Sequence, residues 1–177
     1  TQSAEKPKIF ITSDIHLEHE NIIRFCKRPF LNVNDMNQTL VNNWNKTVGK
    51  KDTVYYLGDL VYNYGLKKNP NAHKERFEYW LNVLNGEKIL IRGNHDPVNI
   101  NLKETLVLKH GKHDFFLCHA PEQVPKDWKN WTICGHHHNN KLEEYPFIDK
   151  KNKRINISTE LTKFHPVDMD DLIKNIE

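Results

Sequence analysis

The sequence predicts an α/β fold, a four-layer α-β-β-α sandwich of two mixed sheets flanked by helices. Short apolar runs of strand length recur along the chain and end in polar residues, and segments with apolar residues at helical spacing lie between them. The chain has 177 residues, of which 37% are hydrophobic, which is enough for one full core. We therefore expect a single domain over residues 1–177.

The predicted strands share one pattern, a continuous apolar run that ends at a residue able to bind a metal ion or a proton. Continuous runs of this length suit strands that are buried on both faces. The strands are predicted at 8–14, 53–59, 88–94, 114–119 and 131–136, with a further strand at 154–159. Because the second half of the chain carries more strand than helix, we expect two sheets.

Other segments have the apolar stripe of a helix that packs on a sheet. Residues 35–48 follow a cap at Asn34 or Asp35, residues 72–84 form a second helix, and residues 167–176 form the last one. Strands that alternate with helices are typical of layered α/β domains.

The net charge of +3 does not by itself indicate a nucleic-acid partner. Lysine far outnumbers arginine, asparagine is abundant and alanine is scarce, which is typical of AT-rich coding bias. The sequence has no apolar run of membrane-spanning length, and TQSAEKPK at its start has no apolar signal-peptide core. We expect a soluble, cytoplasmic protein with no membrane partner, and the sequence does not indicate its oligomeric state.

The three cysteines, Cys26, Cys118 and Cys134, are too few for a disulfide framework and odd in number. Cys118 and Cys134 stand one or two residues before a histidine, so a Cys/His zinc site is one alternative. Both also lie inside apolar strand-like runs, where a free thiol behaves as a small hydrophobic residue. We favour buried thiols over zinc ligands.

Polar side chains follow the predicted strands at the edge where ligands bind in open α/β sheets. They are Asp14 with His16, Asp59, Asn94 with His95, His119, and His136 with His138. Carboxylate, imidazole and amide groups suit divalent ions such as Mn, Fe or Zn. Even without His95 the set exceeds what one ion needs, so it favours two metal ions that share a carboxylate.

These residues stand in motifs that resemble, in order and spacing, those of the calcineurin-like metallophosphoesterase superfamily. The motifs are DIH (14–16), GD (58–59), GNHD (93–96), His119 in LCHA, and GHHH (135–138). The segment HENIIRFCKRPF after the first motif is similar to that of small, uncapped prokaryotic and phage members. The resemblance implies a phosphoesterase that acts by attack of a hydroxide bridging two metal ions.

The resemblance also implies a role for each motif residue. The implied ligands are Asp14, His16 and His138 for one ion, Asn94, His119 and His136 for the other, and Asp59 between them. His95 would face the scissile phosphate without binding metal, so His95 and Asp59 are the expected catalytic residues. The expected cofactors are two divalent ions, Mn first, with Fe, Zn, Ni or Mg as alternatives.

The sequence departs from the family pattern at the second motif. Many members continue this motif with another acid, as GDxxD, whereas this chain reads GDLVYN with Asn63 beyond, which removes a carboxylate behind the ligands rather than a ligand. His137, the middle of the histidine triplet, would point away from its neighbours in an extended backbone. The histidines without motif context, expected at the surface, are His73, His110, His113 and His165.

Candidate substrate contacts follow the first motif. His19 either contacts the substrate or caps the following helix. Arg24 and Arg28 either bind a phosphate at the rim of the site or are solvated cations on a short amphipathic helix.

The expected substrate is a small phosphodiester or a nucleotide. A nuclease acting on DNA or RNA is an alternative, although the chain has no long basic tract, and a phosphomonoesterase is another. A binding module that has lost catalysis is disfavoured because the motif ligands and His95 are all present. The expected partner is therefore a small phosphoester, and nucleic acid is the less favoured alternative.

Overall fold

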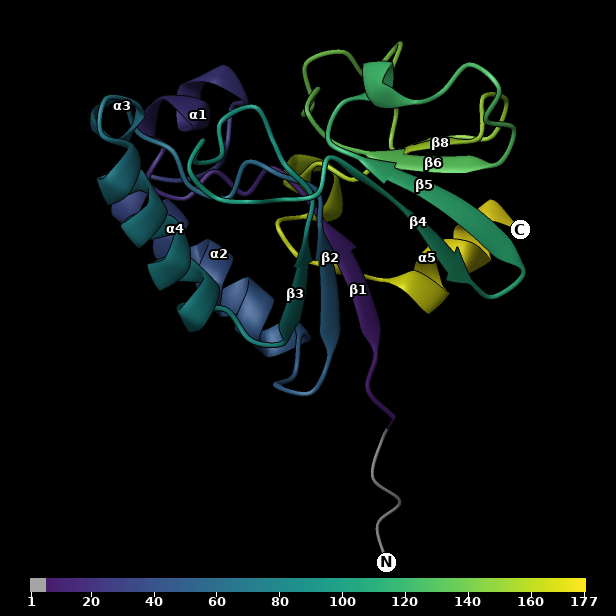
Figure 1. Ribbon diagram of the computed structural model, residues 1–177, viewed down its shortest axis with the longest axis horizontal. Helices are drawn as coiled ribbons and strands as arrows, with labels where there is room; N and C mark the ends of the chain where they lie inside the picture. The colour runs from purple at the N-terminus through teal and green to yellow at the C-terminus, as the bar shows by residue number, and fades with distance from the viewer. Residues whose placement is uncertain (1–5) are drawn as a thin grey trace, which may run out of the picture.

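The computed structural model describes residues 6–177 and contains two mixed β-sheets that pack against each other (Figure 1). The first sheet has the strand order β3-β2-β1-β9. Its strands β1 (Ile9–Thr12), β2 (Thr53–Tyr56) and β3 (Glu87–Leu90) are parallel, and β9 (Val167–Asp168) pairs with β1 in the antiparallel direction. The parallel strands bring the loops that follow them to the same edge of the sheet.

The second sheet has the strand order β4-β5-β6-β8-β7. Its strands are β4 (Thr105–His110), β5 (His113–Cys118), β6 (Trp131–Cys134), β7 (Ile148–Asp149) and β8 (Arg154–Asn156). Strands β5, β6 and β8 are parallel, whereas β4 and β7 are antiparallel to their neighbours. The predicted α/β fold with two mixed sheets is confirmed.

Helices pack on the first sheet and at its carboxyl edge (Figure 1). They are α1 (Glu20–Phe25), α2 (Val33–Thr47), α3 (Tyr64–Lys67) and α4 (Pro70–Val83). Trp44 of α2 and Phe77 of α4 are buried in the core on the outer face of this sheet. The predicted cap of α2 at Asn34 or Asp35 is wrong, because Asn32 Oδ1 accepts the hydrogen bond from the Asp35 amide at 2.9 Å.

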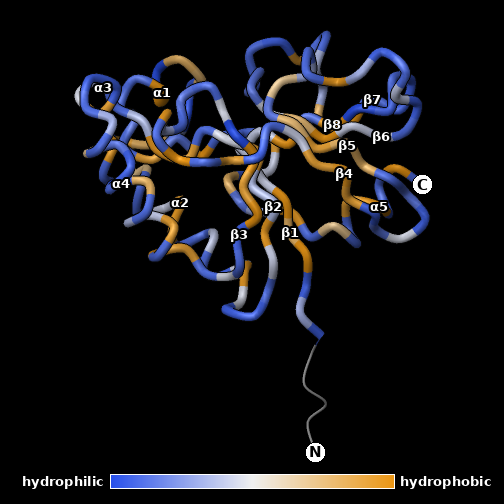
Figure 2. Tube along the Cα trace, in the orientation of Figure 1, coloured by the Kyte–Doolittle hydropathy of each residue, from blue (hydrophilic) through white to orange (hydrophobic). Residues whose placement is uncertain are grey.

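A second apolar core fills the space between the sheets, and Figure 2 shows hydrophobic residues along the strands that enclose it. Ile11 of β1, Phe115 of β5 and Ile133 of β6 are buried there. Leu172 of α5 (Met169–Ile176) belongs to the same core, so α5 packs at the edge between the sheets.

The outer face of the second sheet is covered by the loop after β5, which contains the short helix η1 (Pro121–Gln123). Trp128 of this loop packs against Phe116, with 5.5 Å between the ring centroids. A second short helix, η2 (Thr159–Thr162), follows β8 and approaches the loop after β1.

The structure differs from the sequence predictions at particular elements. The sequence does not predict β4, whose run TLVLKH ends without a metal-binding motif. The predicted helix at 167–176 begins only at Met169, because the two residues before it pair with β1 as β9. His73 is not a surface residue: it is buried, and its Nε2 lies 2.8 Å from the carbonyl oxygen of Val61.

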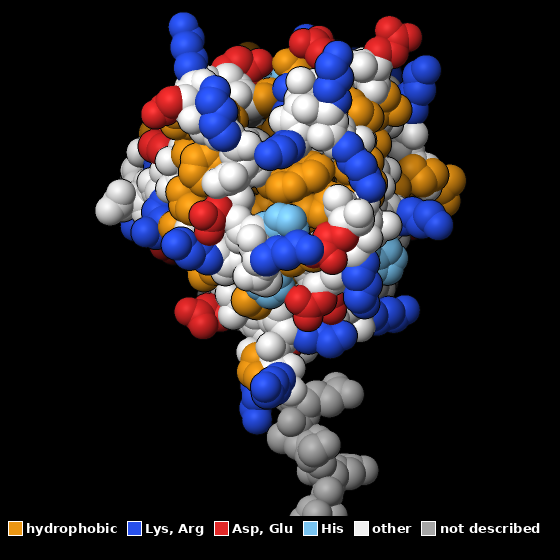
Figure 3. Space-filling view, turned by 90° about the vertical axis from the view of Figure 1, so that its right-hand side faces the viewer, with side chains coloured by type: hydrophobic (Ala, Val, Ile, Leu, Met, Phe, Trp, Pro, Cys, Tyr) orange, Lys and Arg blue, Asp and Glu red, His pale blue; other side chains and the backbone are white. Residues whose placement is uncertain are grey.

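Figure 3 shows the face that lies at the right of Figure 1, where basic and acidic side chains are interspersed. The basic side chains of this face therefore do not form a uniform basic surface.

Across residues 6–177, each helix is too short or too polar to span a bilayer.

Candidate metal centre

The loops after β1, β2, β3, β5 and β6 meet at one edge of the fold, where those after β1, β2, β3 and β6 line a cavity of about 590 Å³. The predicted ligands that line this cavity are His16, Asp59, Asn94, His136 and His138. Asp14 and His119 are buried beside it. The structure therefore brings all of the predicted ligands together.

The first group of ligand atoms surrounds Asp14. Its Oδ1 lies 3.6 Å from Nε2 of His138 and 3.8 Å from Nε2 of His16. Nε2 of His16 is in turn 3.4 Å from Oδ2 of Asp59. Atoms at such separations can bind one ion between them, and Asp14, His16 and His138 form a candidate metal-binding group.

The second group surrounds His119. Its Nε2 lies 3.3 Å from Oδ2 of Asp59 and 2.9 Å from Oδ1 of Asn94. Nδ1 of His136 is 3.1 Å from the same Asn94 oxygen and 3.2 Å from Nε2 of His119. Oδ2 of Asp59 therefore belongs to both groups.

The donor atoms fit a divalent ion. Among the described residues, Oδ1 of Asp14 and Nε2 of His16 are buried and have no hydrogen-bond partner. A buried polar atom without a partner costs about 1–3 kcal/mol, a cost that a bound cation removes. The groups offer oxygen and nitrogen atoms, which suit Mn, Fe or Zn.

The electrostatics of the site favour positive charge. Burial raises the pKa of Asp59, but hydrogen bonds and charges from His119 and His16 outweigh burial and hold the pKa well below its usual range. Burial lowers the pKa of His138, yet Asp14, Cys26 and Glu160 raise it to about 11. The buried carboxylates therefore stabilise positive charge in the site, whether it is a proton on an imidazole or a metal ion bound by the imidazole nitrogens.

Hydrogen bonds behind the ligands orient the imidazole rings. Nδ1 of His119 donates to the carbonyl oxygen of Leu57 at 2.7 Å, and Nδ1 of His138 donates to Oε1 of Glu160 at 2.9 Å. In each ring these bonds occupy Nδ1, so Nε2 is the nitrogen that faces the candidate metal position. Partners of this kind fix the tautomer of a ligating histidine.

The ligand backbone is strained. The predicted ligands with positive φ angles are Asp14 (60°), His16 (50°), Asp59 (62°), His136 (70°) and His138 (51°). Residues other than glycine adopt this region rarely, at a cost of about 1–3 kcal/mol each, and they cluster at functional sites. These residues lie in the loops after β1, β2 and β6, where the ligands reach the site.

Glycines in the motifs make room for the ligand carboxylates. A Cβ atom on Gly93 would overlap Oδ1 of Asp59, and one on Gly135 would overlap Oδ2 of Asp14. The motif glycines therefore allow the backbones after β3 and β6 to approach the carboxylates closely.

Asp96, the last residue of GNHD, holds the backbone of two ligand loops. Its carboxylate accepts hydrogen bonds from the amides of Gly93 at 2.7 Å, Asp59 at 3.1 Å and Leu60 at 3.0 Å. Burial and the charge of Asp59 raise its pKa to about 6. Asp96 thus ties the loop after β3 to the loop after β2. Asp96 belongs to the GNHD motif, but the motif alone does not predict this role.

His95 lies at the cavity without belonging to either ligand group. Its backbone amide donates to Oδ1 of Asp59 at 2.8 Å, and its ring centroid is 5.6 Å from that of His16. The ring is half-buried, and burial lowers its pKa. His95 therefore stands beside the candidate metal positions, where it can face a bound phosphate. His137 points away from the ligands, as expected, and stacks on Tyr145 with 3.9 Å between centroids.

His19 is positioned by His16 rather than by the helix that follows. Its side chain makes no capping hydrogen bond to α1, and its Nδ1 lies 3.0 Å from Nδ1 of His16. Burial and neighbouring cations lower the pKa of His19 to about 3, so its neutral ring can accept a hydrogen bond from Nδ1 of His16. His19 also lines the cavity, and its contact with substrate stays a prediction.

The two predicted rim arginines have different environments. Arg24 is exposed, with its guanidinium 5.4 Å from the ring centroid of Phe25. The expectation that Arg28 lies at the rim is wrong, because its side chain is 0% exposed. Arg28 donates to the carbonyl oxygens of Ile15 at 2.7 Å and Asp14 at 2.8 Å, and it pairs with Glu160 at 2.7 Å. Arg28 therefore anchors the backbone of the first motif.

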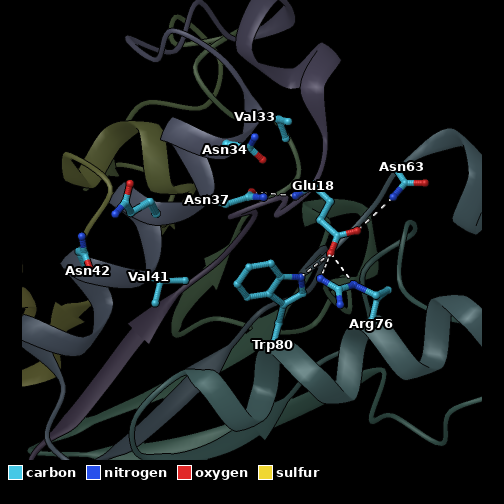
Figure 4. A pocket seen from close by; sticks show the side chains of 10 residues that line it. Glu18, Val33, Asn34, Asn37, Val41, Asn42, Asn63, Arg76 and Trp80 are labelled. Carbon is cyan, nitrogen blue, oxygen red and sulfur yellow. Dashed lines mark hydrogen bonds and ion pairs between the residues drawn. The ribbon is translucent and has the colours of Figure 1, made fainter.

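Glu18 ties the loop after β1 to helix α4 (Figure 4). Its Oε1 accepts hydrogen bonds from Trp80 Nε1 at 2.9 Å and Arg76 Nε at 2.6 Å, and its Oε2 accepts one from Asn63 Nδ2 at 3.1 Å. These residues line a second cavity of about 630 Å³, which shares Glu18 and Asn63 with the metal-site cavity. Asn63 also caps α3.

The cysteines are buried, as predicted. Burial raises the pKa of the Cys118 thiol and raises that of Cys134 to about 12. Within residues 6–177, the candidate metal-binding groups include Cys26, with His138 and Glu160, but neither Cys118 nor Cys134. The structure thus favours thiols in the core over a Cys/His zinc site.

Two mixed sheets that bring carboxylates, imidazoles and an amide to one edge form the architecture of a metallophosphoesterase. The model of the calcineurin-like phosphoesterase family matches residues 7–175, and the chain therefore belongs to this family. The predicted resemblance is confirmed. Membership makes the protein a phosphoesterase, a hydrolase of phosphoester bonds, and implies divalent metal ions as cofactors.

Individual relatives add little about function. The chain is 46% identical over 171 residues to the uncharacterized protein MJ1445 of Methanocaldococcus jannaschii, covering 96% of this chain and 92% of that protein. It is 34% identical over 95 residues to the gene 66 protein of Mycobacterium phage L5, covering 51% of this chain and 42% of that one. A solved structure, the protein of unknown function AQ665 from Aquifex aeolicus, has a TM-score of 0.68 at 22% identity, covering 97% of this chain and 100% of that chain, and shares the fold.

Proposed function

We propose that the protein is a binuclear metal-dependent phosphodiesterase that hydrolyses a small phosphodiester or a nucleotide. One observation carries the binuclear part of the proposal. Oδ2 of Asp59 lies 3.4 Å from Nε2 of His16 in one ligand group and 3.3 Å from Nε2 of His119 in the other. A carboxylate oxygen in this position can be shared by two ions.

Each residue has a role in this proposal. Asp14, His16 and His138 hold one ion, Asn94, His119 and His136 hold the other, and Asp59 bridges them. When bound, two such ions activate water and neutralise the charge that develops on the phosphate oxygens. The mixed nitrogen and oxygen ligands favour Mn over Mg.

His95 acts on the substrate rather than on the metal ions. Its backbone amide donates to Asp59 Oδ1, which holds the main chain of His95 beside both ligand groups. From that position it neutralises charge on the phosphate or donates a proton to the leaving oxygen. The partner of the protein is in this view a small phosphoester, bound in the cavity beside His95.

The test is a metal and activity measurement on Asp59→Ala. Wild type saturated with Mn should bind two ions and hydrolyse bis(p-nitrophenyl) phosphate. Asp59→Ala should lose both occupancies together, because the bridge is common to both groups. Asp127→Ala, which changes an exposed carboxylate in the loop after β5, is the matched control and should behave as wild type. A wild type that holds one ion at saturation contradicts the binuclear proposal.

A further inference from the structure

Two large aromatic side chains are exposed at the mouth of the metal-site cavity. Phe25, the last residue of α1, is 55% exposed, and Tyr64, the first residue of α3, is 69% exposed. Both line the cavity that contains His16, Asp59 and His95. Aromatic rings left in water beside a polar site are available to contact the part of a ligand that extends out of it.

Further rings connect the mouth to the candidate catalytic residue. The ring centroid of Phe25 is 6.4 Å from that of His19, and His19 is 4.8 Å from Tyr62. Tyr62 is in turn 4.5 Å from His95. One wall of the cavity is thus made of ring systems from the exposed Phe25 to His95.

Each exposed ring carries a cation. The guanidinium of Arg24 lies 5.4 Å from the Phe25 centroid, and the ammonium group of Lys68 lies 4.5 Å from the Tyr64 centroid. Within residues 6–177, neither cation has an ion-pair partner. The carboxylates that line this cavity are Glu18, which pairs with Arg76, the exposed Glu20 and the buried Asp59. Each exposed ring therefore combines a stacking surface with an adjacent cation.

We propose that Phe25 and Tyr64 stack on the nucleobase of a nucleoside esterified to the scissile phosphate, so the substrate class is a nucleoside phosphodiester. This inference rests on the proposed function, because it places the scissile phosphate at the metal centre. Rings with adjacent cations are the usual platform for bases on a phosphate backbone. A cavity of about 590 Å³ lies in the size range of small-ligand sites. Since every base has a stacking face, the site prefers nucleosides over alkyl groups but discriminates weakly between bases.

The test compares two substrates that share a leaving group. Thymidine 5′-(p-nitrophenyl phosphate) and ethyl p-nitrophenyl phosphate differ only in the group that would reach the exposed rings. With the Mn-loaded full chain, kcat/KM should be higher for the thymidine ester. Phe25→Ala and Tyr64→Ala should each lower the ratio of the two kcat/KM values at least about fivefold, mainly through KM for the thymidine ester.

A matched control is Tyr79→Ala, because Tyr79 is 49% exposed and carries the Arg76 guanidinium at 4.5 Å but does not line the metal-site cavity. It should leave the ratio at its wild-type value. Phe25→Tyr should retain the preference, since it keeps a ring. A ratio near one in wild type, or a ratio that neither alanine variant changes, overturns the inference and leaves the phosphodiesterase proposal intact.

Failure of the proposed function has a different signature. If neither ester is hydrolysed with any metal ion, the binding of thymidine monophosphate by the Mn-loaded chain is measured by calorimetry. Weaker binding by Phe25→Ala and Tyr64→Ala, and not by Tyr79→Ala, then supports the nucleoside site. Equal binding by all of the variants rejects it.

Discussion

Nδ1 of His138 donates a hydrogen bond to Oε1 of Glu160 at 2.9 Å, and the side chains of both residues are buried. Burial raises the pKa of Glu160, but His138 and Arg28 lower it to about 2, so the group is a carboxylate. A charged acceptor behind the ring makes the opposite nitrogen of His138 a stronger metal ligand.

Replacing this carboxylate should weaken metal binding. In Glu160→Gln the shape of the side chain is kept and its charge is lost, so the affinity for Mn at the His138 site should fall about 10- to 100-fold. A titration with Mn, monitored by isothermal calorimetry, measures the change in affinity. Glu143→Gln alters an exposed carboxylate and should have wild-type affinity. Unchanged affinity in Glu160→Gln would show that Glu160 does not support the ligand.

Arg28 should contribute to stability rather than to substrate binding. Its guanidinium is buried, pairs with Glu160 and donates to two backbone carbonyls, so Arg28→Ala removes one of the two charged partners of the buried Glu160, the other being His138. Breaking such a pair costs about 3–5 kcal/mol in the free energy of unfolding. Urea denaturation measures the loss, and Arg24→Ala, at an exposed position, should change stability by no more than about 0.5 kcal/mol. If Arg28→Ala kept wild-type stability and raised only KM, Arg28 would after all contact the substrate.

Glu160 and Arg28 have roles in the site that the sequence does not predict. The residues after β1, β2, β3, β5 and β6 can be predicted as a group, because apolar runs locate the strands and parallel strands bring their ends to one edge. Glu160 stands in STELT, which has no motif, and reaches the site because Ser158 pairs with Ser13 beside β1. The local sequence predicts Arg28 as either a phosphate-binding residue at the rim or a solvated cation, because its partner Glu160 is 132 residues away.

The fold, like the site, has elements that the sequence predicts and elements that only tertiary contacts define. The predicted strands with continuous apolar runs are present, whereas β9, two residues long, is defined by its pairing with Phe10 and Ile11. Such a short segment has too few residues for a periodic signal. The role of Glu18 is likewise not predicted, because its partners Arg76 and Trp80 belong to α4 and the local sequence does not indicate that contact.

The thiols should be unreactive in the folded protein. Cys26, Cys118 and Cys134 are at most 2% exposed, so an alkylating reagent should modify them only after unfolding. Treatment with a chelator should not change this result, because the thiols are held by packing rather than by an ion. Mass spectrometry after iodoacetamide treatment, with and without urea, provides the measurement. A thiol that becomes reactive on metal removal while the circular dichroism spectrum is unchanged would be identified as a metal ligand.

The last prediction separates chemistry from metal binding. His95 lies beside both ligand groups but belongs to neither, and its position is set by its backbone amide on Asp59. A residue that neutralises charge or donates a proton in the transition state contributes typically about 100- to 10,000-fold in rate. His95→Ala should therefore lower kcat by an amount in this range while the bound Mn stays at the wild-type level, as measured by atomic absorption. The control is His110→Ala, which removes an imidazole of β4 that pairs with Asp170 of α5 and should leave kcat unchanged. A loss of Mn in His95→Ala equal to the loss of activity would identify His95 as a ligand and require a different residue to face the phosphate.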